Sequence, residues 1–379
     1  MNLFDVYPLF SIEPVQARGS YLWDKAGNKY LDFYGGHAVI SIGHTHPYYV
    51  DKITDQLNKI SFYSNSVQIP IQKELAEKLG KLSGYVDYSL FLCNSGAEAN
   101  ENALKLASFH TGRKKIISFS QGFHGRTSLA VAVTDGSSMQ APVNQTDNAI
   151  LLPFNDESAL EAAMNDEVAA VIIEGMQGVG GVKIPTSSFL TKIRSLCDKF
   201  GAVLILDEVQ SGYGRSGKFF AHQHFNIKAD LITTAKGMGN GFPIAGVLIS
   251  PEFKASHGML GTTFGGNHLA CAAGVAVLDV IEQESLIQNA ADMGTYLVNK
   301  LKSIRGVREV RALGLMIGLE LEIPCAEIRG ALLKERAIFT GSSSDKNTIR
   351  LLPALNIGRE EADLFLNAFN EVLSKILDK

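Results

Sequence analysis

The middle of the chain alternates short apolar runs with helical patterns, and this alternation restricts the possible fold more than any other feature. Strand-like runs occupy 90–93, 115–119, 168–173, 203–207, 231–234 and 245–249. Helical patterns at 98–110 and 188–200 place apolar residues on one stripe. Strands that alternate with helices predict an α/β fold whose mainly parallel sheet is wrapped by helices.

The two ends of the chain differ from this middle part. After a helical stretch from 267 to about 284, the pattern becomes helix, strand, strand, helix, and a final helix covers 359–377. The N-terminal segment is too short for a core of its own. We therefore expect an N-terminal segment, 1–43, that packs with a C-terminal small domain, 285–379, beside a large domain, 44–284.

Composition excludes several classes of partner. The chain is 46% hydrophobic and 20% charged, with a net charge of -4 and no polybasic run, so we expect neither nucleic acid nor membrane as a partner. Its apolar runs have strand length and its start lacks a basic region, which favours a cytoplasmic protein without an anchor. The cysteines stand singly, and the pairs His44-x-His46 and His222-x-His224 lack further ligands, so we expect no metal site.

Polar residues that directly follow strands are the candidates for chemistry, because ligands of open α/β sheets gather at the carboxyl ends of strands. Asn94–Glu98 leads from a strand into a helix through small residues whose free N–H groups suit a phosphate, although Ser95 could simply cap the helix. Asp207 ends an apolar strand, where a buried carboxylate needs a cationic partner. A pyridinium nitrogen is one such partner, and a helix or an arginine is the structural alternative.

Lys236 follows the next strand-like run. Its amine could form an imine with an aldehyde and move a proton, whereas a solvated surface lysine is the alternative. Phe123 offers a face for stacking and Arg126 a grip for a carboxylate. The glycines after Lys236 open no helix, and neither a P-loop nor a GxSxG motif occurs, which disfavours dinucleotide-binding, P-loop and serine-hydrolase classes. Together these residues match the requirements of a pyridoxal 5'-phosphate (PLP) site.

Five motifs carry a resemblance to a known family: NSGAEANE at 94–101, FHGRT at 123–127, DEVQSGYGRSG at 207–217, the Lys236 region and TTFGGN at 262–267. Over nearly its whole length the chain resembles the class III aminotransferases. The resemblance implies a fold type I PLP enzyme with a large and a small domain. It also implies a homodimer whose active site lies at the subunit interface.

The resemblance implies a role for each candidate residue. Lys236 would carry PLP as a Schiff base, Asp207 would keep the ring nitrogen protonated, and Gly96 and Ala97, next to Ser95, would bind the phosphate. The other expected cofactor contacts are the ring sandwich of Phe123 and Val209, Gln210 at the 3'-oxygen, and Thr263 reaching the phosphate of the other subunit. The expected substrate contacts are Arg126 for the distal carboxylate, Arg350 for the α-carboxylate of glutamate, and Thr262, Tyr7 and His37.

The implied reaction transfers the δ-amino group of an N-acylated ornithine to 2-oxoglutarate in a ping-pong cycle. Arginine biosynthesis would use it, and arginine breakdown would use nearly the same site. The alternatives are a free-ornithine or 4-aminobutyrate aminotransferase, an aminomutase of the same fold, and a non-catalytic binding protein.

Two departures from the family concern the substrate side. Val179 stands where relatives carry an acid that pairs with the C-terminal arginine, so we hypothesise that another acid or a bound anion compensates Arg350. His37 stands where acetylornithine enzymes tend to have an aliphatic residue and free-ornithine enzymes a tyrosine. We hypothesise that His37 lets the enzyme accept N-succinylornithine at least as well as N-acetylornithine.

Overall fold

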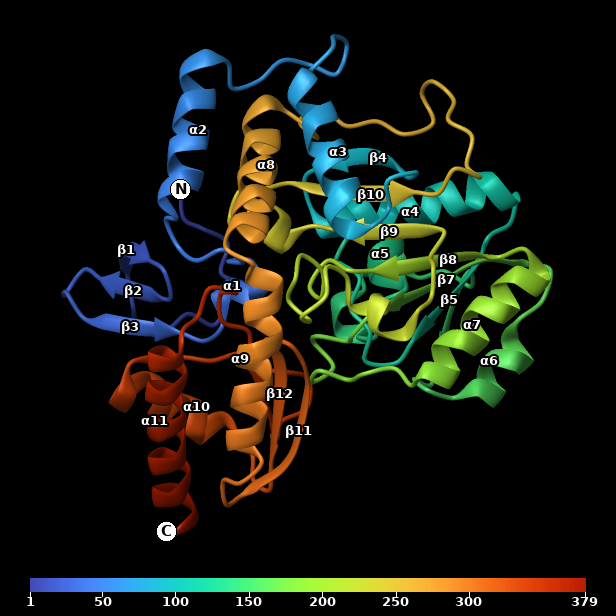
Figure 1. Ribbon diagram of the computed structural model, residues 1–379. Helices are drawn as coiled ribbons and strands as arrows, with labels where there is room; N and C mark the ends of the chain where they lie inside the picture. The colour runs from blue at the N-terminus through green and yellow to red at the C-terminus, as the bar shows by residue number, and fades with distance from the viewer.

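The computed structural model describes residues 1–379, apart from the side chain of Ser137. At its centre is a seven-stranded sheet in the order β4-β10-β9-β8-β7-β5-β6 (Figure 1). These strands are β4 (Ser89–Cys93), β5 (Lys115–Phe119), β6 (Ala149–Leu152), β7 (Val168–Glu174), β8 (Val203–Asp207), β9 (Leu231–Thr234) and β10 (Ala245–Ile249). Strands β9, β8, β7, β5 and β6 are parallel, whereas β10 is antiparallel to both neighbours. The predicted α/β fold with a mainly parallel sheet is confirmed.

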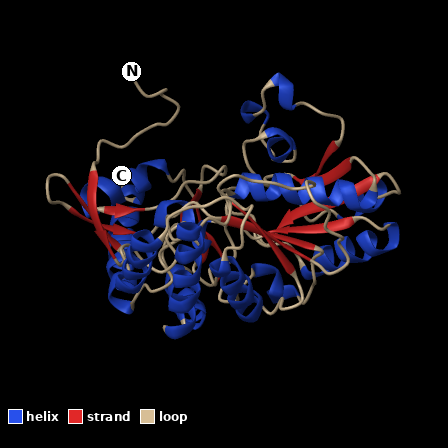
Figure 2. Cartoon of the chain, turned by 90° about the horizontal axis from the view of Figure 1, so that it is seen from above, coloured by secondary structure: helices blue, strands red, loops and turns tan.

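Helices lie on both sides of this sheet (Figure 2). Because successive strand residues point to opposite faces, Val171 and Ile173 join one apolar cluster and Ile172 joins the other. The first cluster includes residues of α3 (Pro70–Ser83), α7 (Ser187–Phe200) and α8 (His268–Gln283), and the second includes α4 (Gly96–Thr111). The short helices α5 (Ser128–Ala132) and α6 (Glu157–Ala163) complete this part of the chain. Burial on both faces explains why β7 and β8 are apolar up to their last residues, Glu174 and Asp207.

Two smaller sheets flank the central one. The first joins β1 (Pro14–Arg18), β2 (Tyr21–Asp24) and β3 (Lys29–Asp32) to β13 (Ile338–Phe339), which pairs in parallel with β3. The second is antiparallel and contains β11 (Val307–Leu313), β12 (Met316–Leu321) and β14 (Thr348–Leu351). The helices of this region are α9 (Leu286–Leu301), α10 (Ala326–Arg336) and α11 (Arg359–Leu377). The division into 1–43, 44–284 and 285–379 stays a prediction, which the β3–β13 pair favours.

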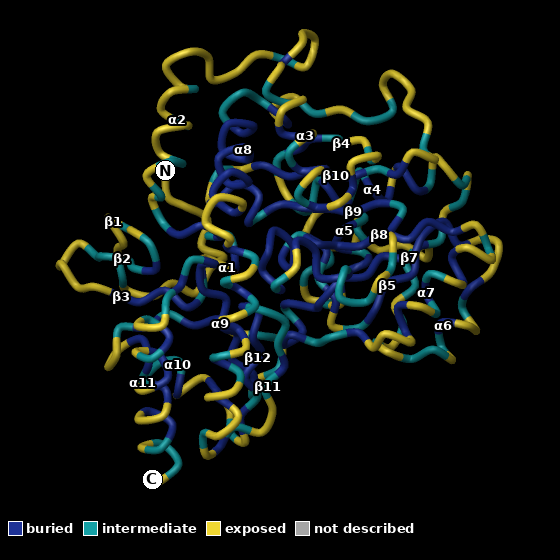
Figure 3. Tube along the Cα trace, in the orientation of Figure 1, coloured by how far each residue is buried: buried dark blue, intermediate teal, exposed yellow. Residues whose placement is uncertain are grey.

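The N-terminal region exposes much apolar surface. The first residues extend away from the body of the molecule (Figure 2), and the side chains of residues 1–10 are exposed. The short helix α1 (Gly35–Ala38) leads to α2 (Pro47–Lys59), an amphipathic helix without a buried residue (Figure 3). Within the described residues, no helix combines the length and the apolar character that a membrane span requires.

The sheet positions the candidate residues through its register. Asn94 follows β4, Asp207 ends β8, and Lys236 lies just beyond β9. Glu174, at the end of β7, is the register partner of Asp207. The parallel strands therefore bring residues from distant parts of the chain to one edge of the sheet.

Candidate active site

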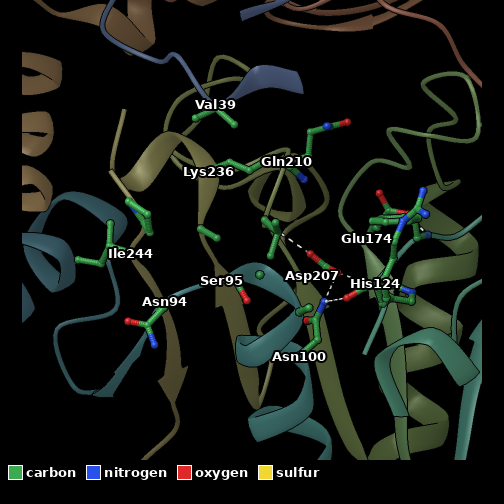
Figure 4. Close-up of a pocket in the computed structure, with 18 of the residues that line it drawn as sticks. Val39, Asn94, Ser95, Asn100, His124, Glu174, Asp207, Gln210, Lys236 and Ile244 are labelled. Atoms are coloured by element: carbon green, nitrogen blue, oxygen red, sulfur yellow. Dashed lines mark hydrogen bonds and ion pairs between the residues drawn. The ribbon is translucent and has the colours of Figure 1, made fainter. Parts of the chain in front are cut away.

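A cavity of 430 Å³ lies at the carboxyl ends of the central strands (Figure 4). This volume is sufficient for a small organic ligand. The cavity is lined by nine of the residues that the sequence predicts for the site: Ser95, Gly96, Ala97, Phe123, Arg126, Asp207, Val209, Gln210 and Lys236.

The first turn of α4 forms one wall of the cavity. Ser95 is the N-cap, and its hydroxyl oxygen accepts a hydrogen bond from the Glu98 N–H at 3.2 Å. Ser95 therefore caps the helix, which was the alternative to a phosphate contact. Gly96 must lack a side chain, because a Cβ there would lie 2.6 Å from a methyl group of Val209. At the start of a helix the N–H groups of the first residues have no intrahelical acceptor. Gly96 and Ala97 therefore offer donors for a phosphate at the positive end of the helix dipole.

Asp207 is 3% exposed and is held from three sides. Its Oδ2 accepts hydrogen bonds from Asn100 Nδ2 and His124 Nδ1, both at 2.8 Å, and its Oδ1 accepts one from the Val209 N–H at 3.0 Å. The Asn100 side chain is itself fixed by Thr233, whose hydroxyl donates to Asn100 Oδ1 at 2.7 Å. These bonds fix the orientation of the carboxylate and leave Oδ1 able to accept a further hydrogen bond.

Glu174 is a second buried acid beside Asp207. Its carboxylate accepts hydrogen bonds from the Phe123 N–H at 3.0 Å and the Gly178 N–H at 2.9 Å. Burial raises the pKa of Glu174 to about 7, although His124 opposes the shift. Glu174 therefore ties the Phe123 loop to the Gly178 loop, and its raised pKa lets it keep a proton up to about pH 7.

Lys236 begins a short 3₁₀ turn, Lys236–Met238, and has a left-handed backbone with φ 44°. Burial lowers the pKa of its amine, while Asp207 and Glu174 counteract part of the shift. A lower pKa increases the fraction of neutral amine, which is the nucleophilic form. The amine can therefore react with an aldehyde in the cavity.

The described residues fit PLP in three respects. The start of α4 presents donors for the phosphate, and the Gly96 position is closed to any larger residue by Val209. Asp207 is fixed as an acceptor for a protonated ring nitrogen, and Lys236 opens into the same cavity. The fit of three separate features to one molecule makes PLP the natural cofactor of this site.

Sequence reasoning assigned no role to Asn100, His124 or Glu174, although each of them lines the cavity. Asn100 and His124 lie inside motifs that were recognised, but their bonds to Asp207 cross large distances in sequence. Glu174 could have been predicted from the sequence, because it is an acid at the end of an apolar strand. The same pattern identified Asp207.

Arg350 lies on β14 and is 4% exposed. Its guanidinium donates to the Ser342 carbonyl oxygen at 2.5 Å, to Gln210 Oε1 at 3.3 Å and, over 3.5 Å, to the Tyr34 hydroxyl oxygen. These partners within the described residues are neutral oxygens. Burial lowers the pKa of Arg350 and Glu174 is close enough to oppose part of this shift, but its carboxylate accepts hydrogen bonds from two backbone N–H groups and not from the guanidinium. The hypothesis that another acid or a bound anion compensates Arg350 stays a prediction.

The other predicted substrate residues do not line the cavity of the single chain. Thr262 accepts a hydrogen bond from Asn94 Nδ2 at 3.2 Å, while the next residue, Thr263, is exposed. Tyr7 is 71% exposed in the N-terminal segment. His37 is exposed too, but its carbonyl oxygen accepts a hydrogen bond from Gln210 Nε2 at 3.1 Å, next to the cavity.

Comparison with known sequences identifies the family. The family model described as aminotransferase class-III matches residues 6–373. The acetylornithine aminotransferase of Archaeoglobus fulgidus is 41% identical, over 96% of this chain and 96% of its own. The acetylornithine aminotransferase of Nitrosomonas europaea is 38% identical, over 100% of this chain and 98% of its own.

Solved structures agree with this result. An ornithine aminotransferase from Toxoplasma gondii, described with partial occupancy of PLP at its active site, aligns with a TM-score of 0.90 and 27% identity. The alignment covers 98% of this chain and 92% of the other. A transaminase from the marine bacterium Virgibacillus aligns with a TM-score of 0.91 and 26% identity, over 97% and 93% of the chains. The chain belongs to the class III aminotransferases and is a PLP-dependent enzyme of fold type I that acts on amino acids.

Proposed function

We propose that the enzyme transfers the δ-amino group of N-acetylornithine or N-succinylornithine to 2-oxoglutarate. The observation that carries the proposal is a single cavity lined by Lys236, Asp207 and the guanidinium of Arg126, with a second guanidinium, that of Arg350, next to it. Arg126 lines the cavity, and Arg350 donates to Gln210, which also lines it. The names of the relatives at about 40% identity favour the acylated substrate over free ornithine.

The proposed cofactor contacts assign the residues that line the cavity to the parts of PLP. Gly96 and Ala97, beside the N-cap Ser95, would bind the phosphate through N–H groups, and Thr263 of the partner subunit would complete that contact. Phe123 and Val209 would enclose the ring, and Gln210 would donate to the 3'-oxygen. Asp207 Oδ1 would hold the proton on the ring nitrogen.

The chemistry divides between the cofactor and the protein. When bound, PLP supplies an aldehyde that exchanges amines and a ring that accepts electrons from the reacting carbon. Lys236 Nζ would take a proton from the substrate carbon that bears the amino group and deliver it to the cofactor carbon that keeps the nitrogen. In the second half of the cycle the same amine would move a proton in the opposite direction, onto the carbon of 2-oxoglutarate that receives the amino group. Asp207, fixed by Asn100 and His124, keeps the ring nitrogen protonated throughout.

The two arginines match the two kinds of substrate. An acylated ornithine carries a carboxylate far from the reacting carbon, which Arg126 binds with help from Tyr7 and Thr262. Glutamate and 2-oxoglutarate carry a second carboxylate next to the reacting carbon, which Arg350 binds. A planar guanidinium suits both contacts because it can hold a carboxylate with two parallel hydrogen bonds.

His37 contributes to the choice of acyl group. Partial desolvation and the charges of Arg350 and Lys236 lower its pKa, so His37 is neutral near pH 7. We assign its Nδ1 as the acceptor of the Tyr34 hydroxyl, which leaves the Nε2–H as a donor for a succinyl carboxylate. Its contribution is then a hydrogen bond and not a charge.

We further propose that the enzyme is a cytoplasmic homodimer. Helix α2 without a buried residue, and exposed apolar side chains such as Leu3, Phe4 and Phe264, favour a partner surface of the same chain. The exposed Tyr7 and Thr263 would then reach the site of the other subunit. Four free, buried cysteines suit a reducing compartment.

The test is kcat/KM for N-succinylornithine, N-acetylornithine and free ornithine at a fixed concentration of 2-oxoglutarate. We expect an acylated substrate to lead free ornithine by at least about tenfold, or about 1.4 kcal/mol of transition-state discrimination. His37→Ile should lower the ratio of succinyl to acetyl activity. A lead for free ornithine contradicts the substrate assignment, and an unchanged ratio contradicts the role of His37.

A further inference from the structure

The buried guanidinium of Arg350 has an unusual set of hydrogen-bond partners. Its partners are the Ser342 carbonyl, the Gln210 amide and the Tyr34 hydroxyl, and all of them are neutral. Neutral oxygens satisfy N–H groups without cancelling the charge. The guanidinium therefore keeps its attraction for an incoming carboxylate, and it needs a device that holds it in place.

Tyr34 is built into position against Arg350. Its N–H donates to Asp32 Oδ1 at 2.9 Å, which fixes the backbone at the end of β3. Its ring lies 5.9 Å from the guanidinium carbon, measured to the ring centroid. Gly341 leaves space for the ring, since a Cβ at that position would collide with it. The ring and the hydroxyl of Tyr34 therefore both face Arg350.

The hydrogen bonds around Tyr34 have one consistent direction. Arginine can only donate, so the Tyr34 hydroxyl oxygen accepts from Arg350 and its proton is directed to His37 Nδ1. The His37 carbonyl accepts from Gln210 Nε2, and Gln210 Oε1 accepts from Arg350. Tyr34, His37, Gln210 and Arg350 thus form a closed ring of contacts.

This ring requires a neutral imidazole at His37. The charged groups that face His37 are Arg350 and Lys236, and both oppose a positive charge on it. Tyr34 also faces Arg329 and Asp32. A protonated His37 would turn its Nδ1 into a donor, and the Tyr34 hydroxyl would then lose its acceptor.

We propose that Tyr34, with His37 as its acceptor, is a positioning residue that orients Arg350 for the dicarboxylate amino acceptor in place of the missing acid at Val179. The proposal rests on the proposed function, because it assigns the acceptor's α-carboxylate to Arg350. An arriving carboxylate replaces the long, neutral hydrogen bond to Gln210 and does not have to break an ion pair, while the Tyr34 hydroxyl keeps its hydrogen bond to the guanidinium. Tyr34 then sets the affinity for the acceptor and has little influence on the amino donor.

Tyr34→Phe in the holoenzyme tests this role, because it keeps the ring beside Gly341 and removes only the hydroxyl. We expect the KM for 2-oxoglutarate to rise about tenfold while the KM for N-acetylornithine changes less than about twofold, consistent with one lost hydrogen bond to a charged group. The Kd of glutarate, measured by calorimetry, should rise by a similar factor. Tyr30→Phe is the matched control, since the Tyr30 hydroxyl donates to Asp24.

The pH profile separates positioning from a purely structural role. In the wild type, the KM for 2-oxoglutarate should rise as the pH falls through the lowered pKa of His37, because protonation of His37 removes the acceptor. In Tyr34→Phe this component should be absent. Equal changes in both KM values, or an unchanged Kd for glutarate, overturn the proposal. Because glutarate binding needs no turnover, this result stands even if the amino donor proves to be a different amine.

Discussion

Asp207 and Arg350 are both buried charged groups of the same site, but their surroundings differ. Asp207 accepts hydrogen bonds from Asn100, His124 and the Val209 N–H, all at 3.0 Å or less. Arg350 makes two of its hydrogen bonds over 3.3 and 3.5 Å, and the acceptors are neutral. The cofactor side is therefore firmly bonded within the chain, whereas the arginine of the substrate side is held by longer, neutral contacts, and a ligand can compete for the one with Gln210.

This difference corresponds to what each region has to do. A cofactor that stays bound benefits from donors and acceptors fixed in advance. The substrate side has to bind two different molecules in turn, so its arginine has to exchange partners in every cycle. Weak neutral contacts allow this exchange at a smaller cost than an ion pair would.

The largest effect is expected on the cofactor side, at Lys236. Lys236→Ala removes both the amine that joins the cofactor and the proton carrier, so kcat should fall by about 10⁴-fold or more. The visible absorbance band of the holoenzyme should disappear as well. Lys228→Ala is the control, because Lys228 lies at the surface beside Asp87. Normal activity in Lys236→Ala would remove the basis of the whole assignment.

The next prediction compares the two regions by the stability of the apoenzyme when Asp207 or Arg350 is replaced. Asp207→Ala leaves three donors unpaired, two of them buried, and should lower the free energy of unfolding by about 3 kcal/mol or more. Arg350→Met removes a buried charge that has no acid partner, so the free energy of unfolding should change by less than about 1 kcal/mol or increase. Denaturant titration at one protein concentration measures both. A larger loss in Arg350→Met than in Asp207→Ala would reverse the comparison.

The buried acid Glu174 should make the stability of the apoenzyme depend on pH. Its pKa is about 7 in the folded chain and 4.5 as the ordinary value, so the folded state binds the proton more tightly. The stability from protonated Glu174 is fully present below about pH 4.5 and is lost as the pH rises through about 7. Against Glu174→Gln, the wild-type apoenzyme should therefore lose about 3 kcal/mol over this interval. Parallel stability curves for the two proteins would contradict the burial of an acid here.

The smallest expected effect concerns the substrate side. Val179→Glu introduces the acid that the family resemblance implies at this position, and an ion pair with Arg350 of about 1 kcal/mol should raise the KM for 2-oxoglutarate about fivefold. Val179→Gln is the matched control, because it has a similar size and no charge. Equal KM values in both variants would mean that residue 179 does not face the arginine.

The sequence predicted much of the central sheet. Strands β5, β8, β9 and β10 and helix α11 have the predicted bounds, because each is a short apolar run or a periodic pattern between clear breaks. The edge strand β6 was not predicted, because Ala149–Leu152 is short and only partly buried. The cofactor residues were predicted from motifs that lie within a few positions of a strand end.

The substrate side was harder to predict because its contacts join distant parts of the chain. Tyr34 and Arg350 are 316 positions apart, and only the packing of β14 near the end of β3 brings them together. Val179 showed that an acid is missing there, and the hypothesis drawn from it was that another acid or a bound anion compensates Arg350. No local pattern indicates that a tyrosine, a histidine and a glutamine would share the role.

The first half of the reaction can be observed by itself. The purified holoenzyme is mixed with N-acetylornithine or N-succinylornithine, without 2-oxoglutarate, while its visible absorbance is recorded. We predict that the visible band bleaches within one turnover, and that it returns when 2-oxoglutarate is added to enzyme freed of donor. A band that bleaches with free ornithine but not with either acylated substrate, or that 2-oxoglutarate fails to restore, would contradict the proposed reaction.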